Sequence, residues 1–180
     1  MKQYDIGIDL GTTSIIIATE EQGVVFRQPT IGAVDTRTNS ILAVGDEALK
    51  MVGRAPAHID LERPLRDGII QDHRMTNELI VRFVNQVCRS RIFKPRIAVC
   101  VPAAITGIEA DAVVESVMAA GARQVYLVDE PVAAALGAGL QIRQPHGCMV
   151  VDIGGGTTDI AVISMGGRVR AARLPVAGDA

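Results

Sequence analysis

Two short segments of the sequence repeat the same combination of acidic, glycine and hydroxyl residues. Residues 6–15 and residues 150–160 each carry apolar residues, an aspartate, a Gly/Thr turn and further apolar residues. Glycine lets the backbone bend sharply and brings N–H groups close to an anion, and threonine hydroxyls add hydrogen bonds with little bulk. The pair therefore predicts two hairpin turns that bind one nucleotide phosphate tail between them.

The residues that these turns offer fall into two chemical groups. Asp9 and Asp152, at the strand ends, are predicted to associate with Mg²⁺ through water, since this cation prefers oxygen ligands and keeps its waters. One such turn alone could equally be a structural β-turn, but two copies, each after an aspartate, favour ligand binding. Neither copy is a Walker A loop or a dinucleotide fingerprint. The predicted phosphate ligands are Gly11, Thr12, Thr13, Ser14, Gly154, Gly155, Gly156 and Thr157.

A third acidic element lies between the two turns in the sequence. Asp129 and Glu130 stand where a predicted strand meets an Ala-rich helix that has Pro131 in its first turn. Phosphoryl transfer to water needs a group that orients the attacking water, and a carboxylate can also accept its proton. Alternatively, both acids only complement the helix dipole. The flanking phosphate turns favour the first reading, so Glu130 is the predicted catalytic residue.

Composition excludes several other classes of function. The chain has 180 residues, 18 Lys and Arg against 20 Asp and Glu, and 3% aromatic residues, which disfavours a basic nucleic-acid binder. The three cysteines lack the paired spacing of a zinc site, and we expect them to be reduced residues of the core: Cys88, Cys100 and Cys148. We see no secretory signal and no apolar stretch long enough to span a membrane.

Periodicity predicts the elements that must position these residues. Helices are expected from Asp46, from Thr76 as a cap, from a Thr106–Glu109 capping box and after Glu130. The alternation of helices and strands after residue 96 predicts an α/β protein with a mixed sheet. The expected strands cover residues 4–9, 14–19, 24–27, 41–44, 96–101, 125–128, 148–153, 159–165 and 168–176.

The two turns and the Glu-Pro-x-Ala-Ala-Ala helix start resemble the actin and DnaK-type chaperone ATPase superfamily. Further segments narrow the resemblance to the MreB/Mbl-type rod shape-determining family, the bacterial actin homologues. This resemblance implies an actin-like (ribonuclease H-like) lobe over residues 1–145, with a small inserted subdomain at about 30–75, and the start of a second lobe over 146–180. The segments that carry it are 44–48, 53–56, 63–68, 101–106, 119–123 and 176–179.

The resemblance also implies a function. It implies a filament-forming cytoskeletal protein that binds ATP and Mg²⁺, in which Glu130 positions the hydrolytic water. Its implied partners are other filament subunits, the inner face of the cytoplasmic membrane and the cell-wall elongation machinery, without nucleic acid. The implied location is therefore cytoplasmic and peripheral to the cell membrane.

Two departures from the family pattern leave alternatives open. The first turn reads Gly-Thr-Thr-Ser, closer to the chaperone pattern, so a chaperone-like nucleotide switch is the second hypothesis. The interval from Asp9 to Asp152 is shorter than the resemblance implies for such chaperones. The chain also stops at Ala180, about where the family continues into its second lobe. An inactive fragment is the third hypothesis, and we expect weak or absent ATPase activity from this chain alone.

A basic segment with an apolar centre offers a membrane contact. Ile92 and Phe93 are flanked by cations over residues 89–96. Basic residues approach anionic headgroups while an apolar pair inserts, and the resemblance implies such a loop at this place. Alternatively, Ile92 and Phe93 close the core below the preceding helix.

Overall fold

The computed structural model describes residues 5–66, 69–88, 94–102 and 105–178. A central five-stranded sheet has the strand order β10-β9-β1-β2-β3. In this sheet β9 is parallel to both β1 and β10, whereas β1, β2 and β3 form an antiparallel meander, which we call the first meander. This mixture confirms the predicted mixed α/β sheet. The strands are β1 (Asp5–Leu10), β2 (Ser14–Thr19), β3 (Gly23–Pro29), β9 (Arg96–Val101) and β10 (Gln124–Asp129).

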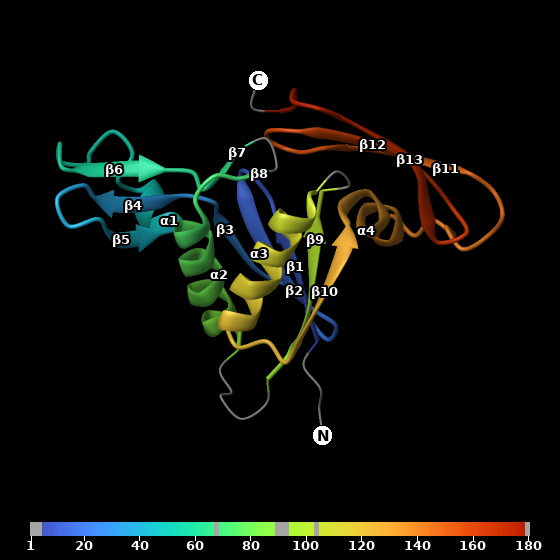
Figure 1. Ribbon diagram of the computed structural model, residues 1–180, viewed down its shortest axis with the longest axis horizontal. Helices are drawn as coiled ribbons and strands as arrows, with labels where there is room; N and C mark the ends of the chain where they lie inside the picture. The colour runs from blue at the N-terminus through green and yellow to red at the C-terminus, as the bar shows by residue number, and fades with distance from the viewer. Residues whose placement is uncertain (1–4, 67–68, 89–93, 103–104, 179–180) are drawn as a thin grey trace.

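Two helices, α2 (His73–Val87) and α3 (Gly107–Ala119), cover one face of the central sheet (Figure 1). Alternation along β1 and β2 directs every second side chain to this face, where the strands and helices form one core. Each large apolar side chain buried there contributes about 1.5–3 kcal/mol. The core includes Ile6, Ile8, Ile15 and Ile17 from the strands and Leu79, Ile80, Phe83, Val84, Val113 and Val117 from the helices.

The start of α2 differs from the prediction. Asp72 caps this helix, and its carboxylate accepts a hydrogen bond of 2.9 Å from the backbone N–H of Met75. Thr76, the predicted cap, is buried one turn inside, where its hydroxyl donates to the carbonyl of Asp72. An aspartate before the first turn accepts hydrogen bonds from the free N–H groups of that turn as well as a threonine does. The apolar period therefore predicts the helix but not its first residue.

The capping box predicted for α3 is confirmed. The Thr106 hydroxyl accepts from the N–H of Glu109, and the Glu109 carboxylate accepts from the N–H of Thr106. The inner face is narrower than predicted, because Met118 is 45% exposed whereas Val113 and Val117 are buried.

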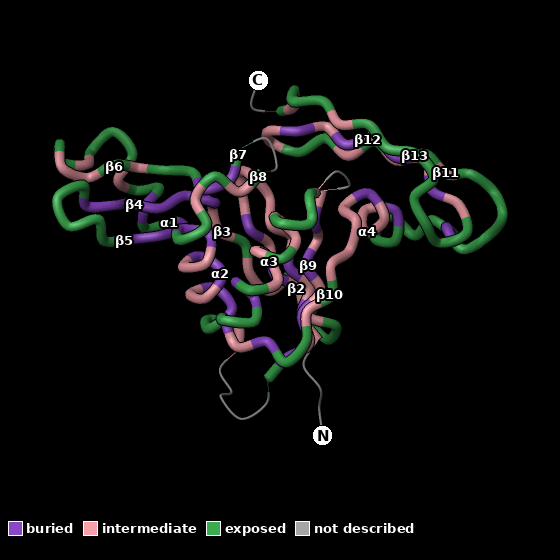
Figure 2. Tube along the Cα trace, in the orientation of Figure 1, coloured by how far each residue is buried: buried purple, intermediate pink, exposed green. Residues whose placement is uncertain are grey.

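A separate small sheet occupies the stretch in which the inserted subdomain is predicted (Figure 1). β4 lies between β5 and β6, and all four residues of β4 are buried (Figure 2). Ile31, Ala33, Ala43 and Ala48 form a core of its own under this sheet. The subdomain boundary remains a prediction. The elements of this stretch are β4 (Gly32–Asp35), β5 (Ser40–Val44), α1 (Asp46–Leu49), β6 (Ile59–Glu62) and the hairpin β7 (Leu65–Arg66) and β8 (Ile69–Ile70).

A second antiparallel meander follows at the far side of the central sheet (Figure 1). It consists of β11 (Cys148–Ile153), β12 (Thr158–Ser164) and β13 (Gly167–Leu174), and we call it the second meander. Helix α4 (Glu130–Gly137) packs under one face of it, with Ala135 against Ala161 and Ile163. Because β10 ends at Asp129 and α4 begins at Glu130, this helix joins the second meander to the central sheet.

Candidate functional site

The two Gly/Thr turns close with the same hydrogen bond. In the first meander the N–H of Gly11 donates to the carbonyl of Ser14 at 3.2 Å, and in the second the N–H of Gly154 donates to the carbonyl of Thr157 at 2.9 Å. A Cβ atom on Gly11 would lie 2.8 Å from the Ser14 carbonyl oxygen, a distance that this turn cannot accommodate without a backbone shift. Glycine is therefore required at this position by close backbone approach.

In each meander, a residue that follows the last strand donates a hydrogen bond to the turn. Directly after β3, the Thr30 hydroxyl donates to the Gly11 carbonyl at 2.7 Å. After β13, the N–H of Gly178 donates to the Gly154 carbonyl at 3.1 Å. The sequence repeat thus corresponds to a repeated three-stranded meander, in which hydrogen bonds hold the turn between the first two strands.

The two turns contact each other. A Cβ atom built on Gly156 would lie 3.3 Å from the Thr12 side-chain methyl group, so the turns of the two meanders approach within van der Waals distance. Residues more than 140 positions apart in the sequence therefore lie side by side, as the repeat predicts. The other predicted ligands belong to these same turns.

The predicted carboxylates act on one another electrostatically. Burial raises the pKa of Asp9, and the nearby charge of Asp152 raises it further, while Arg27 opposes the shift. Burial raises the pKa of Glu130 to about 7, with further contributions from Asp9, Asp159 and Asp152. Asp9, Asp152 and Glu130 therefore share one partly buried, negatively charged region beside the turns.

This region fits a cation better than an apolar ligand. Burial and then the charge of Asp159 raise the pKa of Asp152, so each of the three carboxylates is ionised at an electrostatic cost. A divalent cation nearby would reverse that cost and favour the ionised forms. Among the residues described, no group of three His, Cys, Asp or Glu side chains is arranged to ligate a metal ion directly.

Two charged residues that the sequence analysis missed complete the site. Arg173 on β13 donates from Nε and Nη2 to the Asp159 carboxylate at 3.0 and 2.9 Å. The same guanidinium lies 3.7 Å from the Glu130 carboxylate, and its charge opposes the rise in the pKa of Glu130. Asp159 directly follows the second Gly/Thr turn, which is the one signal that could have identified it. Arg173 carries no such signal, since only the strand pairing places it opposite Asp159.

A cavity of about 190 Å³ adjoins this charged region. Leu10 and Cys100 line it from the central sheet, Glu109 from α3 and Arg173 from the second meander. Cys100 lies close enough to Asp9, Glu130 and Asp152 that their charges, after burial, raise its pKa to about 12. The thiol is therefore protonated at neutral pH and does not add to the negative charge.

The predicted membrane contact cannot be compared with the structure, because Ile92 and Phe93 lie outside the described residues. Among the helices that the structure does describe, none has both the length and the apolar character needed to cross a bilayer.

Comparison with known sequences finds relatives that belong to one family. The profile of the MreB/Mbl protein family matches residues 3–180. The cell shape-determining protein Mbl of Bacillus subtilis is 48% identical over 176 residues, which cover 97% of this chain and 53% of Mbl. The cell shape-determining protein MreB of Escherichia coli is 42% identical over 185 residues, covering 99% of this chain and 53% of MreB. The chain thus spans about half the length of these relatives.

Comparison with solved structures gives the same architecture. MreB5 of Spiroplasma citri bound to AMPPNP superposes with a TM-score of 0.89 at 35% identity, covering 99% of this chain and 54% of MreB5. The ADP-bound MreB5 gives a TM-score of 0.88 at 34% identity, covering 98% of this chain and 53% of that one. The MamK double helical filament, at 22% identity, gives a TM-score of 0.80, covers 99% of this chain and 56% of MamK, and shows the fold alone.

These superpositions confirm the predicted actin-like α/β fold. The match of the family profile over nearly the whole chain, together with relatives above 40% identity, decides the classification. This chain belongs to the MreB/Mbl protein family.

Proposed function

We propose that this chain binds Mg²⁺-ATP between the Gly11–Ser14 and Gly154–Thr157 turns as part of a cell shape-determining filament protein. The observation that carries the proposal is the contact between the two turns, beside the region that Asp9, Asp152 and Glu130 share. The nucleotides in the titles of the related MreB5 structures, ADP and AMPPNP, support this choice of ligand.

Each group of residues has a separate role in this proposal. Backbone N–H groups and the hydroxyls of Thr12, Thr13, Ser14 and Thr157 bind phosphate oxygens, and the glycines let the backbone approach them. Asp9 and Asp152 would hold Mg²⁺ through water, and this cation would neutralise charge on the phosphates when bound. Glu130, at the start of α4, orients the attacking water and accepts its proton.

The ligand-binding step can be tested in this chain with a matched pair of glycine variants. Gly156→Ala would push against Thr12 at 3.3 Å, whereas a Cβ on Gly147 would meet the Val162 side chain at an ordinary 3.8 Å. By isothermal titration with Mg²⁺-ATP, we expect Gly156→Ala to weaken binding about tenfold, equivalent to about 1.4 kcal/mol, and Gly147→Ala to leave it unchanged. Equal affinities for both variants would contradict binding between the turns.

The role of Glu130 concerns hydrolysis rather than binding. In a full-length protein carrying this sequence, Glu130→Ala is expected to slow phosphate release while nucleotide still binds. An unaltered rate of hydrolysis would show that another group positions the water.

We further propose that the full-length protein assembles into filaments at the inner face of the cell membrane and organises cell-wall synthesis there. The cell shape-determining relatives support this function. Sedimentation with and without ATP at matched salt tests self-association and separates a filament protein from an inactive fragment. For the membrane, replacing Ile92 and Phe93 together by serine should reduce sedimentation with anionic liposomes while filaments persist; unchanged binding would exclude this segment.

A further inference from the structure

The Arg173 guanidinium connects the second meander to the first turn of α4. It forms a two-point interaction with Asp159, which is only 3% exposed, and reaches the Glu130 carboxylate at 3.7 Å. A planar guanidinium bonded through two nitrogens to one carboxylate has a fixed orientation. Its Nη2 nitrogen, which donates to Asp159, is also the atom that lies 3.7 Å from the Glu130 carboxylate.

A β-bulge in β13 places two of its arginines on the side of the strand that faces α4. Val162 pairs with Arg170 but its neighbour Ile163 pairs with Arg168, so β13 contains one extra residue at this point. As a result Arg168 and Arg173 lie on the same face of the strand although they are five positions apart. Both reach the start of α4, where Arg168 lies 3.4 Å from the Asp129 carboxylate.

The groups that surround Glu130 come from five strands. The ionised form of Glu130 is disfavoured by three aspartates, Asp9 on β1, Asp152 on β11 and Asp159 on β12. Burial raises the pKa of the neutral Cys100 thiol on β9, and the charges of Asp9 and Glu130 raise it further. Of the charged groups that act on Glu130 in the described part of the chain, Arg173 on β13 is the cation. Among the described residues that act on Glu130, loss of this arginine would therefore leave three negative charges and no cation.

The first meander lacks this arrangement. Its register pairs Asp9 with Ile16 and Ile16 with Arg27, whereas the second pairs Asp152 with Asp159 and Asp159 with Arg173. The position of Asp159 is thus occupied by Ile16 in the first meander, although its turn closes with the same hydrogen bond. The Asp159–Arg173 pair is therefore not needed to form the turn, and it is present in the meander that packs against α4.

We propose that Arg173, oriented by Asp159, is a positioning residue that favours the ionised form of the Glu130 carboxylate and directs it toward the attacking water. This inference rests on the proposed function for the role of Glu130. The charge pairing itself is a property of the folded chain and can be measured without nucleotide. The two parts can therefore fail separately.

The direct test is titration of the Glu130 carboxyl group by NMR in this 180-residue chain. In Arg173→Met the pKa of Glu130 should rise by about one unit, because an opposite charge at this distance lowers a carboxyl pKa by at least that amount. Arg173→Lys keeps the charge but loses the two-point hold on Asp159, so its value should fall between the other two. Amide spectra of each variant check that the fold is intact, and Arg173→Lys serves if Arg173→Met does not fold.

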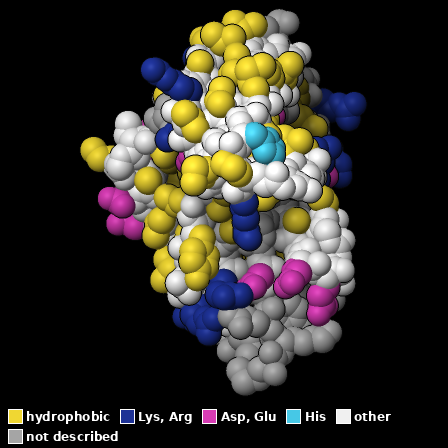
Figure 3. All heavy atoms as spheres, turned by 90° about the vertical axis from the view of Figure 1, so that its right-hand side faces the viewer, with side chains coloured by type: hydrophobic (Ala, Val, Ile, Leu, Met, Phe, Trp, Pro, Cys, Tyr) yellow, Lys and Arg dark blue, Asp and Glu magenta, His cyan; other side chains and the backbone are white. Residues whose placement is uncertain are grey.

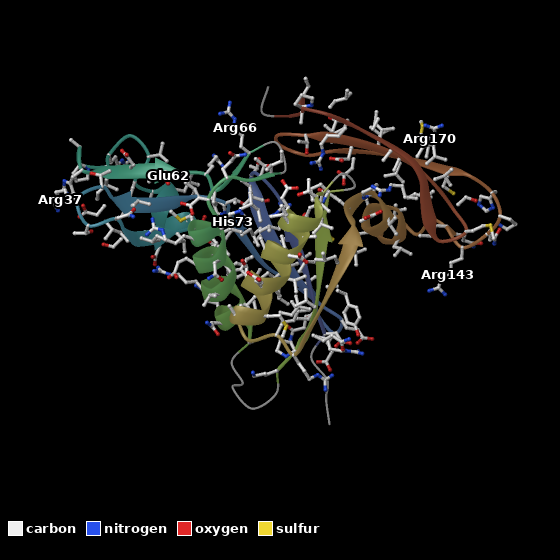
Figure 4. The ribbon with its side chains drawn as sticks, in the orientation of Figure 1. Arg37, Glu62, Arg66, His73, Arg143 and Arg170 are labelled. Carbon is white, nitrogen blue, oxygen red and sulfur yellow. The ribbon has the colours of Figure 1, made fainter. Side chains whose placement is uncertain are left out.

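The control is Arg170→Met on the same strand. Arg170 is exposed and lies on the outer side of β13, away from α4, as Figure 4 shows. The Arg170→Met variant removes the same charge from the chain as Arg173→Met. Because Arg170 lies away from α4, this variant should leave the titration of Glu130 unchanged. An equal shift in both variants would mean that general surface charge is responsible, and an unchanged pKa in Arg173→Met would overturn the inference.

Hydrolysis then separates the inference from the function on which it rests. In a full-length protein, the rise of the ATP hydrolysis rate with pH should move upward in Arg173→Met by the same interval as the pKa of Glu130, whereas a purely structural ion pair would lower the rate at every pH. If the NMR titration moves but the rate profile does not, Glu130 is not the base and the proposed catalytic role fails.

Discussion

The two meanders have the same turn but different surroundings. In the first, Ile6 and Ile8 on β1 are 3% and 1% exposed, because α2 and α3 cover that face. The residues at the matching positions of β11 are Met149 and Val151, which are 68% and 49% exposed. Figure 3 shows hydrophobic side chains gathered on the upper part of the face that the second meander helps to form.

This difference shows that the Gly/Thr turn is a local structure. Gly11 and Gly154 make equivalent hydrogen bonds although one sheet is covered on the face in question and the other is open. The turn depends on its own three strands, whereas the stability of each meander depends on what packs against it. Mutations should therefore affect the two meanders very differently.

The largest contrast is expected in the cores. Ile8→Ala removes a fully buried side chain beneath α2 and α3 and should lower the free energy of unfolding by about 3 kcal/mol. Val151→Ala, at the matching position of the second meander, should lower it by less than about 1 kcal/mol. Urea unfolding followed by circular dichroism measures both. Similar losses would mean that the exposed face of β11 is covered in solution.

The next effect concerns Glu130, which interacts electrostatically with an aspartate of each meander. Burial and neighbouring carboxylates raise the pKa of Glu130 from 4.5 to about 7, so between these values the folded chain holds a proton that the unfolded chain has lost. The free energy of unfolding should therefore fall as pH rises through this window, and the raised pKa values of Asp9 and Asp152 act in the same direction.

Glu130→Gln removes this contribution. The variant should be as stable as the parent near pH 4 and more stable near pH 8, by on the order of 2 kcal/mol. Thermal or urea unfolding at a series of pH values gives the comparison. A constant difference across the series would contradict a buried, titrating Glu130.

The smallest contrast concerns the turns themselves. A Cβ on Gly11 would lie 2.8 Å from a backbone oxygen, against 3.3 Å for Gly154. Gly11→Ala should therefore cost between about 1 and 2 kcal/mol, and Gly154→Ala less than about 1 kcal/mol. Reversed or equal losses of unfolding free energy would show that the two turns are not constrained as the structure has them.

Local sequence signals predicted most of the elements that carry the site. The paired turns, the strands on either side of them, the Thr106 capping box and the start of α4 each depend on a few neighbouring residues, and the structure contains all of them. The predicted residues of the two turns also lie in contact, although their roles in binding remain predictions.

Features that depend on tertiary packing could not be predicted in this way. β4 is buried throughout, so its residues show no alternation of apolar and polar side chains. Met118 has helical spacing but extends beyond the strip of α3 that the sheet covers. The partnership of Arg173 with Asp159 depends on strand pairing and a bulge, neither of which leaves a pattern in the sequence around Arg173.

The direct junction between β10 and α4 has a consequence for preorganisation. Glu130 is the first residue of a helix that follows the strand without an intervening loop, so its backbone is ordered when the chain folds. A carboxylate on a loose loop would lose about 1–2 kcal/mol of backbone entropy per residue each time a substrate fixed it in place. In this chain that ordering is complete on folding, so the proposed nucleotide would not have to supply it from its own binding energy.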